Sequence, residues 1–209
     1  MFFMSRAFLT KPYKREVVDM DKLRSLANDP MWDQGETENF YGFPLPTNKD
    51  FSADASKLAI GVPEDQLYRI GQFVAVKSPD SHIGPFKWAI DFLVPDDTEI
   101  LAAESGQIIE VVDSFTEWGP TEQFRDKLNY LTIRHDNGEH SQYCHLLRNS
   151  FRETGLVVGN RVEKGQMIAR VGKTGWTDRD HLHFIVFRVG NLAGSPYGFY
   201  SLRVRFDTQ

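Results

Sequence analysis

From about Val76 onward, the chain consists of short β-rich runs separated by Gly, Pro, Asp and Asn turns. This texture is typical of an all-β sandwich or barrel. The dipeptide Asn137-Gly138 lies between two such runs and predicts a tight hairpin. We expect strands at residues 88–94, 106–113, 130–135, 141–146, 167–171 and 181–188, and a further one near 201–206.

The first part of the chain has a different, irregular pattern. It predicts one short helix that begins near Asp19 or Asp21 and stops at Asp29-Pro30. The aromatic and proline-rich stretch 39–46 is expected to pack along a neighbouring surface rather than to form a core of its own. We therefore predict a partly helical N-terminal extension, residues 1–70, followed by one β domain, residues 71–209.

Composition narrows the range of functions. The 209 residues are 41% hydrophobic and 25% charged, which is ordinary for a soluble globular protein. The net charge is -5 and no run of Lys or Arg is present, so neither nucleic acid nor an anionic membrane is an expected partner. The apolar start is too short for a secretory signal, and no later stretch is long enough to span a bilayer. Oligomeric state is not readable from the sequence.

Cysteine use limits the kinds of metal site that are possible. Cys144 is the single cysteine, so neither an internal disulfide nor a thiolate zinc cluster can form. Any zinc site must be built from histidine and carboxylate ligands.

His181 and His183 are two residues apart in a predicted strand. Their side chains should project together, while Leu182, Phe184 and Val186 face the core. Two convergent imidazoles can bind a metal together, or one can bind it while the other transfers protons. The alternative is two strand histidines with ordinary structural partners.

Asp91 is surrounded by apolar residues in the run KWAIDFLVP. A buried, ionised carboxylate must be paired, hydrogen-bonded or bound to a metal. His82 lies upstream in SHIGPF, where the Gly84-Pro85 turn could fold it back toward Asp91. Taken alone, His82 is more typical of a loop histidine.

The remaining histidines are judged from strand alternation. His140 and His145 are an odd number of residues apart, so at most one of them should face the site. The same alternation places His145 with Tyr143 and opposite Cys144, which argues against a cysteine–histidine nucleophilic pair. His135, next to the hairpin turn, is expected to be exposed to solvent.

Several common catalytic motifs are absent from the sequence. It contains no H-E-x-x-H helix, no G-x-S-x-G, no P-loop and no dinucleotide fingerprint. A cupin-type oxygenase would need a glutamate soon after the H-x-H pair, and none follows. The long polar insertion 114–128 is either a functional loop or a surface decoration.

Taken together, the pieces resemble the lysostaphin-type zinc metallopeptidases, which cut peptide cross-links of bacterial cell walls. The resemblance is carried by His82, Asp91 and the segments YCHL (143–146), GKTGW (172–176) and HLHF (181–184). It implies that His82, Asp91 and His183 bind Zn²⁺ and that His145 and His181 flank the zinc-bound water. It also implies an antiparallel β-sandwich with a groove over one sheet, and an extracytoplasmic location.

The resulting hypothesis is a zinc-dependent endopeptidase that acts on peptidoglycan cross-links or stem peptides. Either His145 or His181 would accept the proton of the water, and the other would stabilise the oxyanion. One alternative is a non-catalytic module that uses the same groove for binding or regulation. Another is a metallohydrolase or oxygenase that acts on a non-peptide substrate with a different metal.

Overall fold

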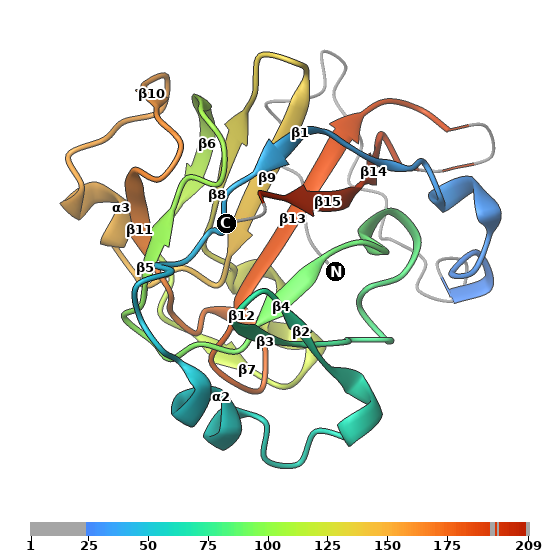
Figure 1. The fold of residues 1–209 in the computed structure, drawn as a ribbon, viewed down its shortest axis with the longest axis horizontal. Helices are drawn as coiled ribbons and strands as arrows, with labels where there is room; N and C mark the ends of the chain where they lie inside the picture. Colours follow the sequence, from blue (N-terminus) through green and yellow to red (C-terminus); the bar gives the residue numbers. More distant parts are fainter. Residues whose placement is uncertain (1–23, 193–194, 196, 208–209) are drawn as a thin grey trace.

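The computed structural model describes residues 24–192, 195 and 197–207, and strands dominate it (Figure 1). The largest unit is a nine-stranded antiparallel sheet in the order β10-β6-β8-β9-β13-β4-β3-β2, with β14 paired to β13. Its strands are β2 (Leu67–Ile70), β3 (Phe73–Val76), β4 (Ile90–Phe92), β6 (Gly106–Val112), β8 (Tyr130–Arg134), β9 (Glu139–Cys144), β10 (Arg161–Val162), β13 (Leu182–Val189) and β14 (Phe199–Ser201). The predicted all-β, antiparallel fold is confirmed.

Three two-stranded ladders surround this sheet. They are β1 (Glu36–Tyr41) parallel to β15 (Arg203–Phe206), β5 (Glu99–Leu101) antiparallel to β11 (Met167–Arg170), and β7 (Trp118–Gly119) parallel to β12 (Gly175–Trp176). Helical segments are short: α2 (Ser52–Leu58), α3 (Ser150–Glu153) and the 3-10 turns η2 (Pro30–Trp32), η3 (Glu64–Gln66), η4 (Gly84–Phe86) and η5 (Glu122–Lys127). Among the described residues, none of these is long and apolar enough to cross a membrane.

Alternate residues of β13 point to opposite faces of the large sheet, and both faces are buried. Phe184 and Val186 enter the main core, which also takes in Ile100 of β5 and Ile168 of β11. Ile185 and its alternate neighbours face a second, smaller cluster on the other side, which includes Trp32, Phe187 and Phe199. A strand buried on both faces explains the nearly continuous apolar run that follows His183.

The hairpin predicted at Asn137-Gly138 joins β8 to β9. Gly138 has φ +81°, a left-handed conformation that glycine adopts without a steric penalty. The Asn137 side chain accepts a hydrogen bond from the Glu139 backbone N–H at 3.0 Å. The turn therefore sets the register of the two central strands.

The stretch 39–46 packs onto the β domain, as predicted. Tyr41 and Leu45 are fully buried in the main core, and Phe43 stacks on Phe206 with ring centroids 4.7 Å apart. The proposed division at residue 70 falls inside the β2–β3 hairpin and stays a prediction. The predicted helix that starts near Asp19 or Asp21 lies outside the described residues up to residue 23.

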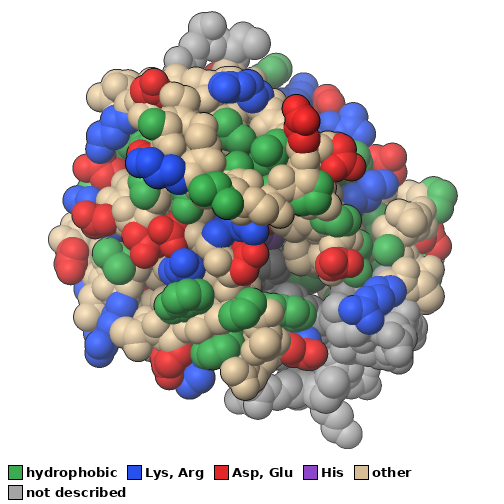
Figure 2. All heavy atoms as spheres, turned by 90° about the horizontal axis from the view of Figure 1, so that it is seen from below, with side chains coloured by type: hydrophobic (Ala, Val, Ile, Leu, Met, Phe, Trp, Pro, Cys, Tyr) green, Lys and Arg blue, Asp and Glu red, His purple; other side chains and the backbone are tan. Residues whose placement is uncertain are grey.

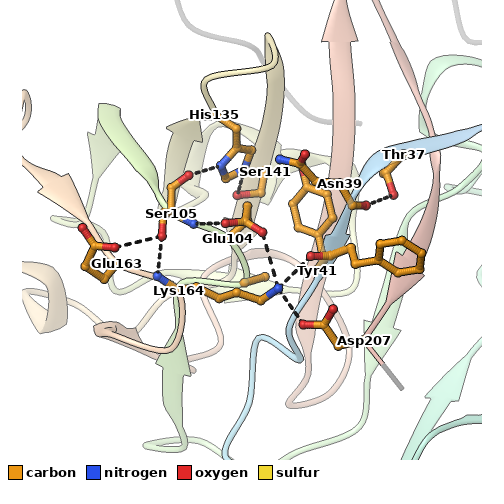
Figure 3. Close-up of polar contacts among 12 residues, drawn as sticks. Thr37, Asn39, Tyr41, Glu104, Ser105, His135, Ser141, Glu163, Lys164 and Asp207 are labelled. Atoms are coloured by element: carbon orange, nitrogen blue, oxygen red, sulfur yellow. Dashed lines mark hydrogen bonds and ion pairs between the residues drawn. The ribbon is translucent and has the colours of Figure 1, made fainter. Parts of the chain in front are cut away.

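The prediction that His135 is exposed to solvent is wrong. Its Nδ1 lies 2.9 Å from the Ser105 carbonyl oxygen, its Nε2 lies 3.0 Å from Ser141 Oγ, and only 2% of the residue is exposed (Figure 3). The ring also meets Tyr41 edge-on, with centroids 5.3 Å apart. A distant segment of the chain thus covers a residue that its local turn would leave exposed.

Candidate metal centre

The ladder of the large sheet brings Asp91 and His183 together. His183 on β13 is paired directly with Asp91 on β4, and paired residues in an antiparallel ladder share a face. His183 Nδ1 lies 2.7 Å from Asp91 Oδ1. On the same strand, Leu182 and Phe184 are fully buried in the core, as the alternation predicted.

His82 reaches the same point from the loop between β3 and β4. Its Nε2 lies 3.2 Å from Asp91 Oδ2, and its ring centroid lies 5.2 Å from that of His183. The turn that follows it contains Gly84, at φ +59°, which lets the chain fold back toward β4. One potential ligand atom each from His82, Asp91 and His183 lies within 4.8 Å of the others.

This donor set suits a catalytic Zn²⁺ ion. Two imidazoles and one carboxylate leave a fourth position of tetrahedral zinc open. Burial alone would raise the pKa of Asp91, but the facing imidazoles of His82, His181 and His183 hold it well below the usual value. Burial lowers the pKa of His183 to about 4, although Asp91 opposes the shift, so at neutral pH this imidazole is in the neutral form that binds metals.

His145 and His181 lie next to this trio, with ring centroids 4.5 Å apart. His145 Nδ1 donates a hydrogen bond to the Thr174 carbonyl oxygen at 2.7 Å. His181 Nδ1 lies 3.0 Å from the carbonyl oxygen of Arg179 and 3.3 Å from Thr177 Oγ1. Because a carbonyl can only accept, both rings are inferred to carry a proton on Nδ1, which assigns proton transfer in the site to Nε2.

The position of His145 differs from the sequence prediction. β9 ends at Cys144, and His145 follows it with φ +64°, so strand alternation no longer applies. Tyr143 is buried in the core, whereas the ring of His145 meets the rings of His181 and His183. The expectation that His145 shares a face with Tyr143 is therefore wrong.

Two other side chains of β9 are poor candidates for chemistry. Cys144 is completely buried, and burial raises the pKa of its thiol well above the usual value, which disfavours the nucleophilic thiolate. His140 lies near the other end of β9 and stacks on Phe187 with centroids 5.2 Å apart. Neither belongs to the cluster around Asp91.

A cavity of about 650 Å³ opens over these residues. Asp91, His145, His181 and His183 line it, together with residues from the segments 61–66, 77–81 and 176–179. Figure 2 shows a recess at the centre of this face with a histidine side chain at its bottom. Its volume is within the range of roughly 300–1,000 Å³ that is usual for ligand pockets.

The insertion 114–128 supports the loop that holds the two flanking histidines. Its strand β7 pairs with β12, where Gly175 N–H donates to Glu117 O at 2.9 Å and Thr177 N–H donates to Gly119 O at 3.0 Å. These bonds lie beside Thr174 and Thr177, the partners of His145 and His181. The insertion therefore contributes to the geometry of the site.

Asn129 follows this insertion in the sequence and is fully buried, and the sequence did not predict a role for it in the site. Its side-chain amide exchanges hydrogen bonds with the Phe115 backbone in both directions at 3.0 Å and donates to Leu146 O at 3.1 Å. Its own N–H donates to Thr174 Oγ1 at 3.1 Å. No local pattern signals this role, because the four bonds join segments that are distant in the sequence.

Comparison with known proteins identifies the family. The model of Peptidase family M23 matches residues 85–194. The peptidoglycan DD-endopeptidase ShyC of Vibrio cholerae is 34% identical over 106 residues, which cover 51% of this chain and 21% of that protein. The glycyl-glycine endopeptidase ALE-1 of Staphylococcus capitis is 31% identical over 98 residues, covering 46% and 23%. A zinc-containing peptidase of Vibrio cholerae with a solved structure is 30% identical, with a TM-score of 0.36 over 47% of this chain and 26% of that one.

The matches cover between 21% and 38% of the length of the curated relatives. The family model, by contrast, spans more than half of the 209 residues and includes Asp91, His145, His181 and His183. The chain therefore belongs to Peptidase family M23, a family of zinc-dependent peptidases.

Proposed function

We propose that this chain is a zinc-dependent endopeptidase that hydrolyses peptide bonds in peptidoglycan, in its cross-links or its stem peptides. The observation that carries the proposal is the convergence of His82, Asp91 and His183 beneath a 650 Å³ cavity that two further histidines flank. Two relatives support the substrate class, because one is named a peptidoglycan DD-endopeptidase and the other a glycyl-glycine endopeptidase.

His82, Asp91 and His183 would hold the zinc ion. Two neutral imidazoles and one carboxylate leave the ion with a net positive charge and an open position. When bound there, zinc acidifies a water molecule and polarises the scissile carbonyl.

His145 and His181 would supply the proton transfers. With Nδ1 committed to a backbone carbonyl, each ring can accept a proton at Nε2 when it is neutral and donate from Nε2 when it is charged. One of the two would accept the proton of the attacking water, and the other would donate to the oxyanion. The carbonyl bonds keep both rings in place while the protons move.

Metal content and turnover of three variants test this proposal. Elemental mass spectrometry of the purified protein should find about one zinc per chain, and His183→Ala should lose it. His145→Ala should retain zinc and no longer cleave purified peptidoglycan. Mass spectrometry of the released peptides measures this cleavage. His140→Gln is the matched control, since His140 lies outside the site, and it should retain both.

Three outcomes would contradict the proposal. Peptidoglycan cleavage by His145→Ala would show that His145 is not needed for proton transfer. A protein that takes up no stoichiometric metal, even after reconstitution with zinc, would favour a binding module. Iron or manganese in place of zinc would favour hydrolytic or oxygenase chemistry on a non-peptide substrate.

A further inference from the structure

We propose that Ser78 is a positioning residue that orients two of the three proposed zinc ligands, Asp91 and His82. This inference rests on the proposed function, because it concerns the same metal centre. Ser78 Oγ donates a hydrogen bond to Asp91 Oδ2 at 2.5 Å. The carbonyl oxygen of Ser78 accepts a hydrogen bond from the His82 backbone N–H at 2.7 Å.

The side-chain bond fixes the rotation of the Asp91 carboxylate. Asp91 Oδ1 faces His183 Nδ1, and Oδ2 faces both His82 Nε2 and the Ser78 hydroxyl. A serine hydroxyl has one proton to donate and an ionised carboxylate can only accept, so the direction of this bond is unambiguous. Partners of this kind around a ligand carboxylate hold it in the orientation that the metal requires.

The backbone bond shapes the loop that carries His82. The carbonyl oxygen of Ser78 accepts from the N–H groups of both Ser81 (2.9 Å) and His82, which closes a single turn of chain from 78 to 82. This turn presents the His82 ring to Asp91. The same residue thus controls the backbone of one proposed ligand and the side chain of another.

The sheet explains why Ser78 is available at this point. Val76, the last residue of β3, is paired directly with Asp91 on β4. The next residue is anchored too, because Lys77 N–H donates to Gln66 O at 2.8 Å. Ser78 therefore leaves the ladder beside Asp91, although the two residues are 13 positions apart in the sequence.

Zinc affinity of the metal-free protein, measured by competition with a chromophoric chelator, tests the proposal. Ser78→Ala should weaken zinc binding by about 10- to 100-fold, the usual effect of removing a partner of a metal ligand. Ser78→Thr retains a hydroxyl on Cβ and should restore most of the affinity. Ser81→Ala is the matched control, because Ser81 lies in the same turn but its hydroxyl donates to the Ser78 carbonyl oxygen, at 3.4 Å, and not to the Asp91 carboxylate.

A second readout separates positioning from folding. Substituted cobalt reports ligand geometry through its visible spectrum, and Ser78→Ala should change that spectrum while the melting temperature of the metal-free protein stays close to that of Ser81→Ala. Wild-type zinc affinity and an unchanged cobalt spectrum in Ser78→Ala would overturn the role of Ser78 and leave the proposed function intact. A wild-type protein that binds no zinc would overturn both.

Discussion

The two ends of β9 each carry a buried polar cluster that contains histidine, yet only one lines the cavity. At the start of the strand lies the closed cluster, defined here as Tyr41, His135, Glu139 and Ser141 (Figure 3 labels Tyr41, His135 and Ser141). At its end lies the candidate metal centre. Both clusters combine imidazole and carboxylate groups, so residue types alone do not distinguish them.

What distinguishes the clusters is where their polar atoms find partners. Both ring nitrogens of His135 have partners within the protein, and Glu139 accepts from Glu38 N–H at 2.6 Å and from Tyr41 OH at 3.0 Å. No member of the closed cluster lines the cavity, whereas four residues of the metal centre do. A buried histidine is therefore expected to have a structural role when protein atoms are hydrogen-bonded to both ring nitrogens. It is expected to have a role in catalysis or metal binding when its ring adjoins a cavity.

The strongest test replaces one histidine from each cluster. His145→Ala should lower kcat on peptidoglycan by about 10²- to 10⁴-fold, the usual contribution of a positioned acid or base, with zinc content unchanged. His135→Asn should lower the melting temperature and leave kcat within about twofold of wild type. Equal losses of kcat in both variants would contradict the assignment of a catalytic role to His145 and a structural role to His135.

Acid should lower the unfolding free energy through His140, which lies next to the closed cluster in β9. Burial lowers its pKa to about 4, against an ordinary value of 6.5 in the unfolded chain. Below pH 6.5 the unfolded state binds the proton first, so stability falls as pH drops toward 4, by about 3 kcal/mol at most. Urea unfolding at pH 7 and pH 4.5 should show a smaller loss for His140→Gln than for wild type. An equal loss in both proteins would assign the acid sensitivity to other groups.

Asn129 provides a test of how the metal centre is supported from outside. Asn129→Ala removes side-chain bonds to Phe115 and Leu146 and should cost about 1–3 kcal/mol of unfolding free energy. Because Thr174 and His145 adjoin those bonds, kcat should fall more than KM rises, with zinc retained. The exposed variant Asn48→Ala should change unfolding free energy by no more than about 0.5 kcal/mol and leave kcat unaltered. Wild-type kcat in Asn129→Ala would show that the insertion does not support the histidines.

The smallest expected effect comes from Tyr41→Phe in the closed cluster. It removes only the hydroxyl that donates to Glu139 and should cost about 1 kcal/mol of unfolding free energy. Zinc affinity by chelator competition should equal that of wild type. A weaker affinity would show that the two ends of β9 are coupled.

Strand periodicity was enough to predict much of the fold and the faces of β13. Leu182, Phe184 and Val186 enter the core, and the Asn137-Gly138 hairpin joins the expected strands. In an unbroken strand the side chains alternate between the two faces, so the sequence was enough to predict which face each of these residues occupies.

Three features lay beyond such reasoning, each for a physical cause. His145 departs from alternation because its backbone is left-handed. His135 is buried because Tyr41, far away in the sequence, covers it. Ser78 meets Asp91 across a ladder, and its own neighbours in the chain carry no sign of that partner.

The left-handed backbone of His145 has a consequence for how this protein can evolve. A residue with a side chain gives up roughly 1–2 kcal/mol in that conformation, and glycine would relieve most of it. The chain nevertheless has an imidazole at the turn, and its hydrogen bond to Thr174 helps to hold it there. At this one position, selection for stability and selection for reactivity favour different residues, so a screen for thermal tolerance alone would be expected to discard the histidine.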